Sequence, residues 1–314
     1  MNCKLPSFAL LLAALLGSSG SAQPPVSATA TENTVTDSVP VTYGAGTEQR
    51  IERGNAIMQA ALESVRGQDS ISARLRQQIN LLGHQLAGPG LYLQQGRGAS
   101  RKFRLEMSIQ RAQASSTISQ VSDGRFLWIY ENLNGQPQLK IVDLRRVRDE
   151  LNARDRQATP LVSESLAMGG LPRMLGDLQN GFQFLPTSET YLGDVPVHEL
   201  RGVWRPEPLA KLLPDQVEAI RAGNAVRLDG LSMQVPHEVV IYIGKQGNFP
   251  HRIEYHRLNK EAEGPRTTAV VILELFEVRL NGPIDDQQFG KPANLPEADY
   301  TRVFLEKLGV KATE

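Results

Sequence analysis

The sequence predicts an α+β fold built on one curved, antiparallel sheet, with amphipathic helices packed against it at both ends of the chain. Three observations indicate this class. Much of the chain from Gly90 to Leu280 alternates apolar and polar residues with the period of two that is typical of strands. Turn sequences of the hairpin type separate several of these segments. Strands do not alternate regularly with helices, which disfavours parallel-sheet folds such as the Rossmann fold and the TIM barrel.

The composition excludes several classes of function. The chain has 314 residues, of which 40% are hydrophobic, so it can bury a core of its own. Its 34 basic and 34 acidic residues give a net charge of zero, which leaves no general attraction to nucleic acid or to anionic membranes. The single cysteine, Cys3, excludes an internal disulfide, a CxxC redox pair and a cysteine-rich zinc site. We therefore expect no nucleic-acid partner and no thiol chemistry.

The first 22 residues have the order of a secretory signal peptide. Lys4 precedes an apolar run that ends at Leu16, and small residues follow up to Ala22. The run is too short for a permanent membrane span, which takes about 20 apolar residues. Cys3 lies before the apolar run, so it does not have the position of an acylated lipoprotein cysteine. We expect cleavage after Ala22, export to the periplasm and no permanent membrane anchor; an N-terminal core helix is the alternative.

Residues 23–47 predict a disordered leader, because they are rich in Pro, Ser, Thr and Ala and show no helical or strand period. A single domain is expected from residue 48 to residue 314, and two amphipathic helices begin it. The apolar stripe of the first helix consists of Ile51, Met58, Leu62 and Val65. The second helix, capped by Ser70 and ended by Gly88-Pro89-Gly90, would carry Ile71, Leu75, Ile79, Leu82 and Leu86 on its stripe.

The sheet is predicted from short alternating segments. In the first of them Phe103, Leu105 and Met107 alternate with charged residues, which predicts one buried and one solvated face. Further strands are expected at 115–121, 125–130, 139–143, 182–185, 195–204, 237–243, 252–258 and 267–280, with hairpin turns at Asp123-Gly124 and Asn134-Gly135. Short helices are expected at 144–152 and 171–180, an insertion at 205–236 and a C-terminal amphipathic helix at 296–308.

No catalytic or metal-binding motif is present in the sequence. The GxSxG, GxxxxGK[ST] and HExxH patterns do not occur. His251, Glu254 and His256 form the one cluster of potential metal ligands, but residues of opposite parity on a strand face opposite ways, so His251 cannot join the other two. Asp285-Asp286 is typical of a solvated turn. We predict no metal, no cofactor and no reaction; a hydrolase of unrecognised type is an alternative.

Two strands carry apolar residues on both faces. They are Phe126 to Tyr130 and Val270 to Phe276. Such strands must be covered on both sides. Either a second layer of the core or a bound apolar ligand can complete their burial, and the residues alone favour plain core.

The segment Gln120 to Tyr130, QVSDGRFLWIY, closely resembles the VSDG-x-x-LW-x-Y strand and turn of the LolA-like superfamily of outer-membrane lipoprotein carriers. Three weaker correspondences follow in the family's order, at 101–105, 239–255 and 281–289. The resemblance covers about Leu75 to Phe289. It implies an incomplete β-barrel whose concave apolar face is closed by helices, and which carries acyl chains of lipoproteins or another lipid across the periplasm.

The resemblance and the apolar periods together suggest a lipid-binding site. We expect Phe103, Leu105 and Met107 to line the concave face, with Ile51, Met58 and Leu62 of the first helix opposite them. Trp128 and Tyr130 are expected in or beside the cavity wall, although a tryptophan packed within the sheet is the alternative. The family's arginine that locks the lid to the barrel would correspond to Arg97 or Arg101.

Two further expectations concern movement and partners. Glycines bound the leading helices, so these helices are expected to act as a lid; a permanently docked pair is the alternative.

The expected partners are the acyl chain of a lipoprotein or another lipid, and membrane proteins of the envelope are a second class that such a role allows. The alternative function is a non-catalytic assembly or interaction module of the envelope with a filled core.

Overall fold

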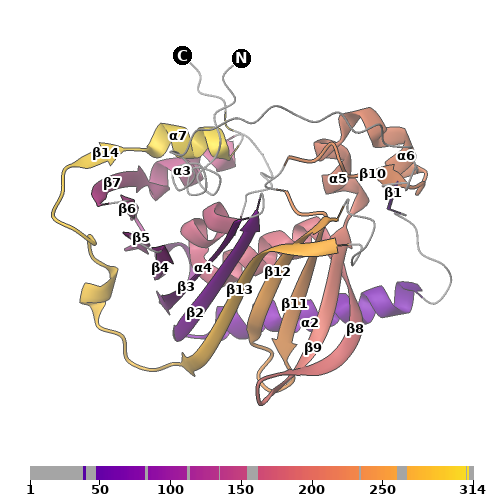
Figure 1. The fold of residues 1–314 in the computed structure, drawn as a ribbon, viewed down its shortest axis with the longest axis horizontal. Helices are drawn as coiled ribbons and strands as arrows, with labels where there is room; N and C mark the ends of the chain where they lie inside the picture. The colour runs from indigo at the N-terminus through magenta and orange to yellow at the C-terminus, as the bar shows by residue number, and fades with distance from the viewer. Residues whose placement is uncertain are drawn as a thin grey trace.

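The centre of the molecule is one sheet of twelve strands, seen in a computed structural model (Figure 1). The structure describes residues 38–39, 47–81, 84–111, 114–133, 135–153, 162–232, 235–259, 267–308 and 310. The strands follow one another across the sheet in the order β14-β7-β6-β5-β4-β3-β2-β13-β12-β11-β9-β8. All neighbours are antiparallel except β14 and β7, which are parallel.

The strands and helices have the following bounds. The sheet contains β2 (Ser70–Leu81), β3 (His84–Gln95), β4 (Lys102–Arg111), β5 (Ala114–Ser122), β6 (Phe126–Leu133), β7 (Gln136–Asp143), β8 (Phe182–Leu192), β9 (Val195–Trp204), β11 (Glu238–Gly244), β12 (Pro250–Leu258), β13 (Thr267–Leu280) and β14 (Glu297–Asp299). The helices are α2 (Thr47–Gly67), α3 (Leu144–Ala153), α4 (Val162–Gly181), α5 (Pro206–Leu212), α6 (Val217–Arg221) and α7 (Thr301–Lys307), with 3-10 turns η1 (Gly98–Ser100), η2 (Pro214–Gln216) and η3 (Asp286–Phe289).

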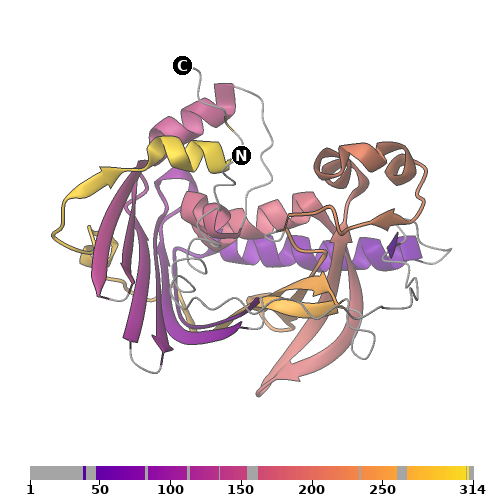
Figure 2. The ribbon, with the colours of Figure 1, turned by 45° about the horizontal axis from the view of Figure 1, so that its top comes forward.

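The sheet curves around two helices. Figure 2 shows α2 and α4 lying in the trough that the sheet forms, with β4 to β7 on one side and β8 to β13 on the other. Helix α2 packs on β8 and alongside α4, and α4 packs on β4. The edges of the sheet, β14 and β8, do not pair with each other, so it is open. The predicted fold class, an α+β fold with one curved sheet that does not close into a barrel, is confirmed; the parallel edge strand β14 is an addition to the prediction.

The prediction of a second helix between Ser70 and Leu86 is wrong, because this segment forms the hairpin of β2 and β3. The two strands are paired continuously from Ser70–Gln95 to Leu81–His84. A spacing of four residues satisfies a period of two as well as the helical period. Ala73 and Gln77, which lie between the predicted stripe positions, are also buried. Leu82 lies outside the described residues.

The triplet Gly88-Pro89-Gly90 lies inside β3 instead of ending a helix. Gly90 permits a close approach of the neighbouring strand, because a Cβ at this position would lie 2.2 Å from the backbone oxygen of Glu106. A glycine within a strand pattern is therefore a packing requirement at this site.

Three other segments differ from the sequence prediction. The helix predicted at 171–180 is the second half of α4, and a first half from Val162, which was not predicted, precedes it. Residues 297–299, predicted as part of a terminal helix, form β14. Within the predicted leader, Ser38–Val39 forms a strand, β1, that pairs with β10 (Val226–Arg227) of the insertion. The predicted signal peptide and the rest of the leader up to residue 46 lie outside the described residues.

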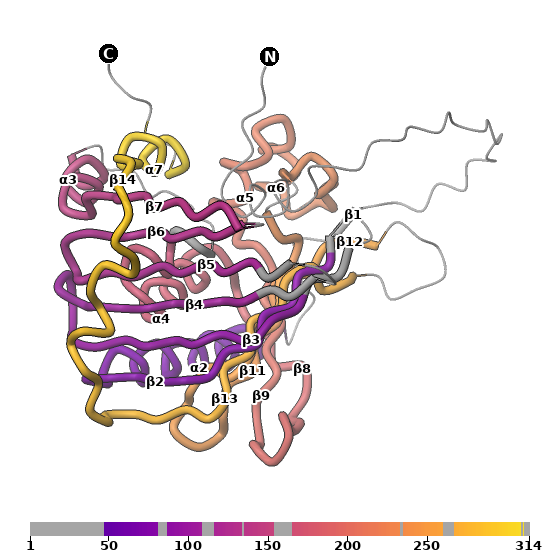
Figure 3. The backbone as a smooth tube through the Cα atoms, turned by 60° about the vertical axis from the view of Figure 1, so that its left-hand side comes forward, coloured from indigo at the N-terminus to yellow at the C-terminus, as the bar shows by residue number. Residues whose placement is uncertain are grey.

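A long connection between β13 and α7 crosses the outer, convex face of the sheet (Figure 3). We call residues 281–300 the strap. Phe289 of the strap is buried, and η3 packs on β4. Asp286, expected in a solvated turn, forms an ion pair with Lys102 at 2.9 Å. The strap therefore covers part of the outer face whose strands carry apolar residues on both sides.

Candidate functional site

The concave face of β4 is apolar in the predicted register. Phe103, Leu105 and Met107 are all buried against the helices. The intervening side chains point outward: Lys102 pairs with Asp286, and Arg104 Nη1 donates to the Gln288 oxygen at 2.8 Å. Alternation along one strand was sufficient to assign these two faces, because a slip by one residue would have exposed every apolar side chain.

Helix α2 approaches the other half of the sheet. Met58 and Leu62 are fully buried and Ile51 is half-buried. The helix lies tightly on β8, where a Cβ at Gly54 would be 2.1 Å from the Phe184 oxygen, and Asn55 Oδ1 accepts from the Phe184 N–H at 3.0 Å. The helix that packs on β4 is α4. The expected direct opposition of α2 to β4 is thus corrected: α4 takes that place.

Trp128 and Tyr130 lie on the outer face of β6, which corrects the expectation that they lie in or beside the cavity wall. Leu127 and Ile129 occupy the concave face and are buried in the core. Trp128 Nε1 donates to Glu297 Oε1 in the strap at 3.2 Å. The turn before the strand is fixed locally, because Asp123 Oδ1 accepts from the N–H of Phe126 at 2.7 Å. An unbroken apolar strand shows no alternation, so its faces could not be assigned from the sequence.

Trp204 is the tryptophan of the helix-covered core. It pairs in register with Phe182, whose ring centroid is 4.2 Å from that of Trp204. Its indole nitrogen donates to the Pro236 oxygen at 2.9 Å. Sequence reasoning did not select this residue for the site.

Helix α4 is broken at Gly169 and Gly170. Gly170 has φ 68° and ψ −159°, values that only glycine adopts readily. Ser165 donates to Asp177 at 2.7 Å. Twelve residues of straight helix would separate this pair by about 18 Å, so the two halves fold toward each other. In the sequence, two glycines followed by Pro172 are typical of the end of one helix and the beginning of the next.

Two polar side chains of β3 hold the break. The Leu171 N–H donates to the Tyr92 hydroxyl at 2.9 Å, and this hydroxyl donates to Gln94 Oε1 at 2.7 Å. Burial raises the pKa of Tyr92 far above its usual value, so the phenol stays protonated. The beginning of the second half of α4 is therefore fixed to the concave face by a buried hydrogen bond.

Both arginines proposed for the lid lock contact a helix end. Arg97 Nη2 donates to the Gly67 oxygen at the end of α2 at 3.1 Å and pairs with Asp69 at 2.8 Å. Arg101 Nη1 donates to the Gly169 oxygen at the break of α4 at 3.4 Å. Partial burial, more than the nearby charges of Arg66 and Arg97, lowers the pKa of Arg101. Each guanidinium thus caps carbonyl groups that a helix terminus leaves without a partner.

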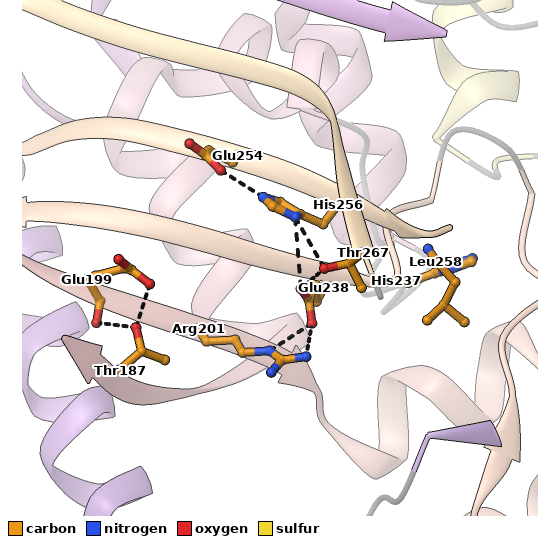
Figure 4. Close-up of polar contacts among 9 residues, drawn as sticks. All are labelled: Thr187, Glu199, Arg201, His237, Glu238, Glu254, His256, Leu258 and Thr267. Atoms are coloured by element: carbon orange, nitrogen blue, oxygen red, sulfur yellow. Dashed lines mark hydrogen bonds and ion pairs between the residues drawn. The ribbon is translucent and has the colours of Figure 1, made fainter. Parts of the chain in front are cut away.

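Charged residues gather on the outer face of β9, β11 and β12 (Figure 4). Glu238 forms an ion pair with Arg201, and His256 Nε2 lies 2.7 Å from Glu254 Oε2. Burial alone would raise the pKa of Glu254. His256 and Arg252 lower this pKa by more than burial raises it, so the pKa of the carboxyl lies below its usual value. Within the described part of the chain, no group of three His, Cys, Asp or Glu side chains could hold a metal ion.

The same cluster contains a hydroxyl, an imidazole and a carboxylate, but not in a catalytic arrangement. Thr267 Oγ1 donates to Glu238 Oε1 at 2.7 Å, while His256 Nδ1 is 3.5 Å away. The hydroxyl proton is therefore directed to a carboxylate and not to the imidazole that would activate the oxygen. Ser122 Oγ, in the family-like turn, accepts from the Gly124 N–H at 3.0 Å. These contacts are structural.

No protein-family model and no curated protein matches the chain. Solved structures do match. A LolA superfamily protein from Nitrosomonas europaea has 11% identity and a TM-score of 0.31, over 76% of this chain and 97% of that chain. The Mycobacterium tuberculosis lipoprotein LppX has 11% identity and a TM-score of 0.37, over 74% and 96%. The MucA/MucB complex of Pseudomonas aeruginosa has 10% identity and a TM-score of 0.39, over 76% of this chain and only 60% of that chain, which is less than two thirds of its length.

Among the described residues, no helix is long and apolar enough to cross a membrane.

Proposed function

We propose that this chain is an exported, non-catalytic binding protein of the cell envelope that takes an acyl chain of a lipoprotein or of another lipid between its concave sheet face and helices α2 and α4, and carries it through the periplasm. The observation that carries the proposal is the cover of the concave face. It consists of two separate helices, one of them broken, which meet the sheet through apolar side chains and not through a continuous second layer.

The residues under the cover suit an acyl chain. The site that we propose is formed by Phe103, Leu105 and Met107 of the sheet, Met58 and Leu62 of α2, and Met174 of α4. Methionine side chains repack around ligands of different shape. Each methylene that leaves water contributes about 0.8 kcal/mol, so a long chain gains affinity without a charged contact. This agrees with the neutral charge of the protein.

A second candidate function is an assembly or interaction module with a permanently filled core. The observation that favours it is close packing under the cover: the side chains of the protein itself bury Met58, Leu171 and Leu175 completely. An acyl chain can enter only if α2 or α4 moves away from the sheet. The two functions thus differ in whether the helices separate from the sheet.

Calorimetric titration of the mature protein with palmitoyl glycerol separates them. The carrier function predicts saturable binding near one ligand per protein, with a negative heat-capacity change because apolar surface is buried. The variant Leu105→Asp should bind much more weakly, whereas Tyr130→Asp on the outer face should bind like the wild type. Absence of saturable binding by the folded wild type would leave the module with a filled core.

A further inference from the structure

The concave face is not uniformly apolar. Within the described part of the chain, three polar side-chain atoms on this face are buried without a hydrogen-bond partner: Gln94 Nε2, Gln120 Oε1 and Tyr255 Oη. Their place follows from the register, because Gln94 pairs with Phe103 and Gln120 with Leu105. An unpaired buried polar group costs about 1–3 kcal/mol. A bound group that supplies the missing partner is one reason for a protein to retain it.

Gln94 has the most defined geometry of the three. It is fully buried, and its Oε1 accepts from the Tyr92 hydroxyl at 2.7 Å. The Tyr92 oxygen itself accepts from the Leu171 N–H at 2.9 Å, so the phenolic proton is left for Gln94. This chain of bonds orients the amide oxygen toward Tyr92 and leaves Nε2 as the free donor.

The free donor lies at the break of α4. A Cβ at Gly170 would be 2.6 Å from Gln94 Oε1 and 2.7 Å from the Tyr92 oxygen, so the amide lies directly against the backbone of the break. On the sheet, Gln94 lies between Ile71 of β2 and Phe103 of β4, which are both buried and apolar. A ligand that separates α4 from the sheet here would meet one neutral hydrogen-bond donor surrounded by apolar surface.

We propose that Gln94 Nε2 donates a hydrogen bond to the carbonyl oxygen of an acyl ester or amide, and that Tyr92 positions the Gln94 amide for this contact. The proposal rests on the acyl-binding function proposed above and names its substrate class. A neutral donor complements a neutral carbonyl group, whereas an alkyl ether or a hydrocarbon would leave the amide unpaired. The protein therefore selects acylated ligands over alkyl ligands of equal length.

Two ligands that differ in the carbonyl group test the proposal. Palmitoyl glycerol and its hexadecyl ether have the same glycerol head and nearly the same chain. The wild type should bind the ester about 3- to 10-fold more tightly, as expected for one hydrogen bond. Gln94→Met should lose this preference and retain its affinity for the ether, and Tyr92→Phe should reduce the preference. Gln77→Met alters another buried glutamine of the concave face and should retain it.

Each outcome decides a separate point. An unchanged ester preference in Gln94→Met, or in Gln94→Leu should the methionine variant fold poorly, would overturn the carbonyl contact. Equal affinity of the wild type for ester and ether would also overturn it, while acyl binding itself would stand. If the folded wild type binds neither ligand, the proposed function fails and the carbonyl site fails with it.

Discussion

The two tryptophans lie on opposite faces of the sheet, which provides an internal control for ligand binding. Trp204 lies in the helix-covered core and Trp128 lies beneath the strap. Addition of palmitoyl glycerol should change the tryptophan fluorescence of the wild type and of Trp128→Phe, and much less that of Trp204→Phe. A change that disappears in Trp128→Phe would place the ligand on the outer face.

Gly170 is the residue on which the break of α4 depends. An alanine here would need an unfavourable φ and would push its Cβ against Tyr92 and Gln94. We expect Gly170→Ala to lower the free energy of unfolding by about 2–4 kcal/mol. Gly193→Ala is the matched control, because Gly193 also has a positive φ but has open space around it. Urea unfolding measures the free energy of unfolding of both variants. Equal decreases in the two variants would show that close packing at the break contributes nothing.

At the scale of residues, the face of the sheet on which a side chain lies could be predicted only where apolar and polar residues alternate. Phe103, Leu105 and Met107 alternate with charged neighbours, so their face followed from the sequence. The strand of Trp128 has no alternation, and the face of Trp128 is identified by its hydrogen bond to Glu297 of the distant strap. Gln94 and Tyr92 gave no sequence signal, because their meeting with Leu171 joins segments far apart in the chain.

At the scale of elements, the error at 70–86 has a local cause. Ile71, Leu75 and Ile79 fit a helical stripe and a strand face equally well, and the burial of Ala73 and Gln77 and the pairing with β3 distinguish the two. The strand predicted at 195–204 coincides with β9, and the apolar stripe from Ile51 to Val65 lies within α2. The break of α4 has a local signal in Gly169, Gly170 and Pro172, whereas its attachment to Tyr92 of β3 joins segments far apart in the chain.

The charged cluster of β9, β11 and β12 predicts how stability depends on pH. The folded pKa of Glu254 is lowered, so its contribution to stability is present above its unfolded value of about 4.5 and is lost as the pH falls through the folded value. Glu254→Gln should therefore be less stable than the wild type near neutral pH, and the difference should shrink in acid. Asp149→Asn, at an exposed position, is the control. The midpoints of urea unfolding, measured for both proteins from neutral pH down to acid pH, test this prediction. A stability difference that stays constant with pH would contradict the role given to the Glu254 carboxylate.

The helical cover should be the less stable layer of the fold. If α2 and the first half of α4 separate from the sheet to admit a ligand, their amide hydrogens should exchange faster than those of β4 and β12. Palmitoyl glycerol should slow the exchange of the helices and leave the strands unchanged. Hydrogen exchange followed by mass spectrometry measures this, and equal protection of helices and strands in both states would show that the helices are fixed core.

At the scale of the whole molecule, the sheet forms a trough, two helices lie in it and the strap crosses its outside. The class of this fold could be predicted from strand periods and turns, because these are local. The order of the strands, the parallel pairing of β14 with β7 and the place of the strap could not, since they depend on contacts between distant segments. The strap contacts Trp128 on the outer face of β6, whereas the concave face is covered by α2 and α4.

The most direct test of the central claim is to identify what the native protein contains. Protein purified from its own cell envelope without detergent should release a lipid with at least one acyl ester or amide on organic extraction, in an amount close to that of the protein, as measured by mass spectrometry. Leu105→Asp, purified in the same way, should release much less. Folded wild-type protein that releases no lipid, and that does not take up palmitoyl glycerol afterwards, would contradict the account.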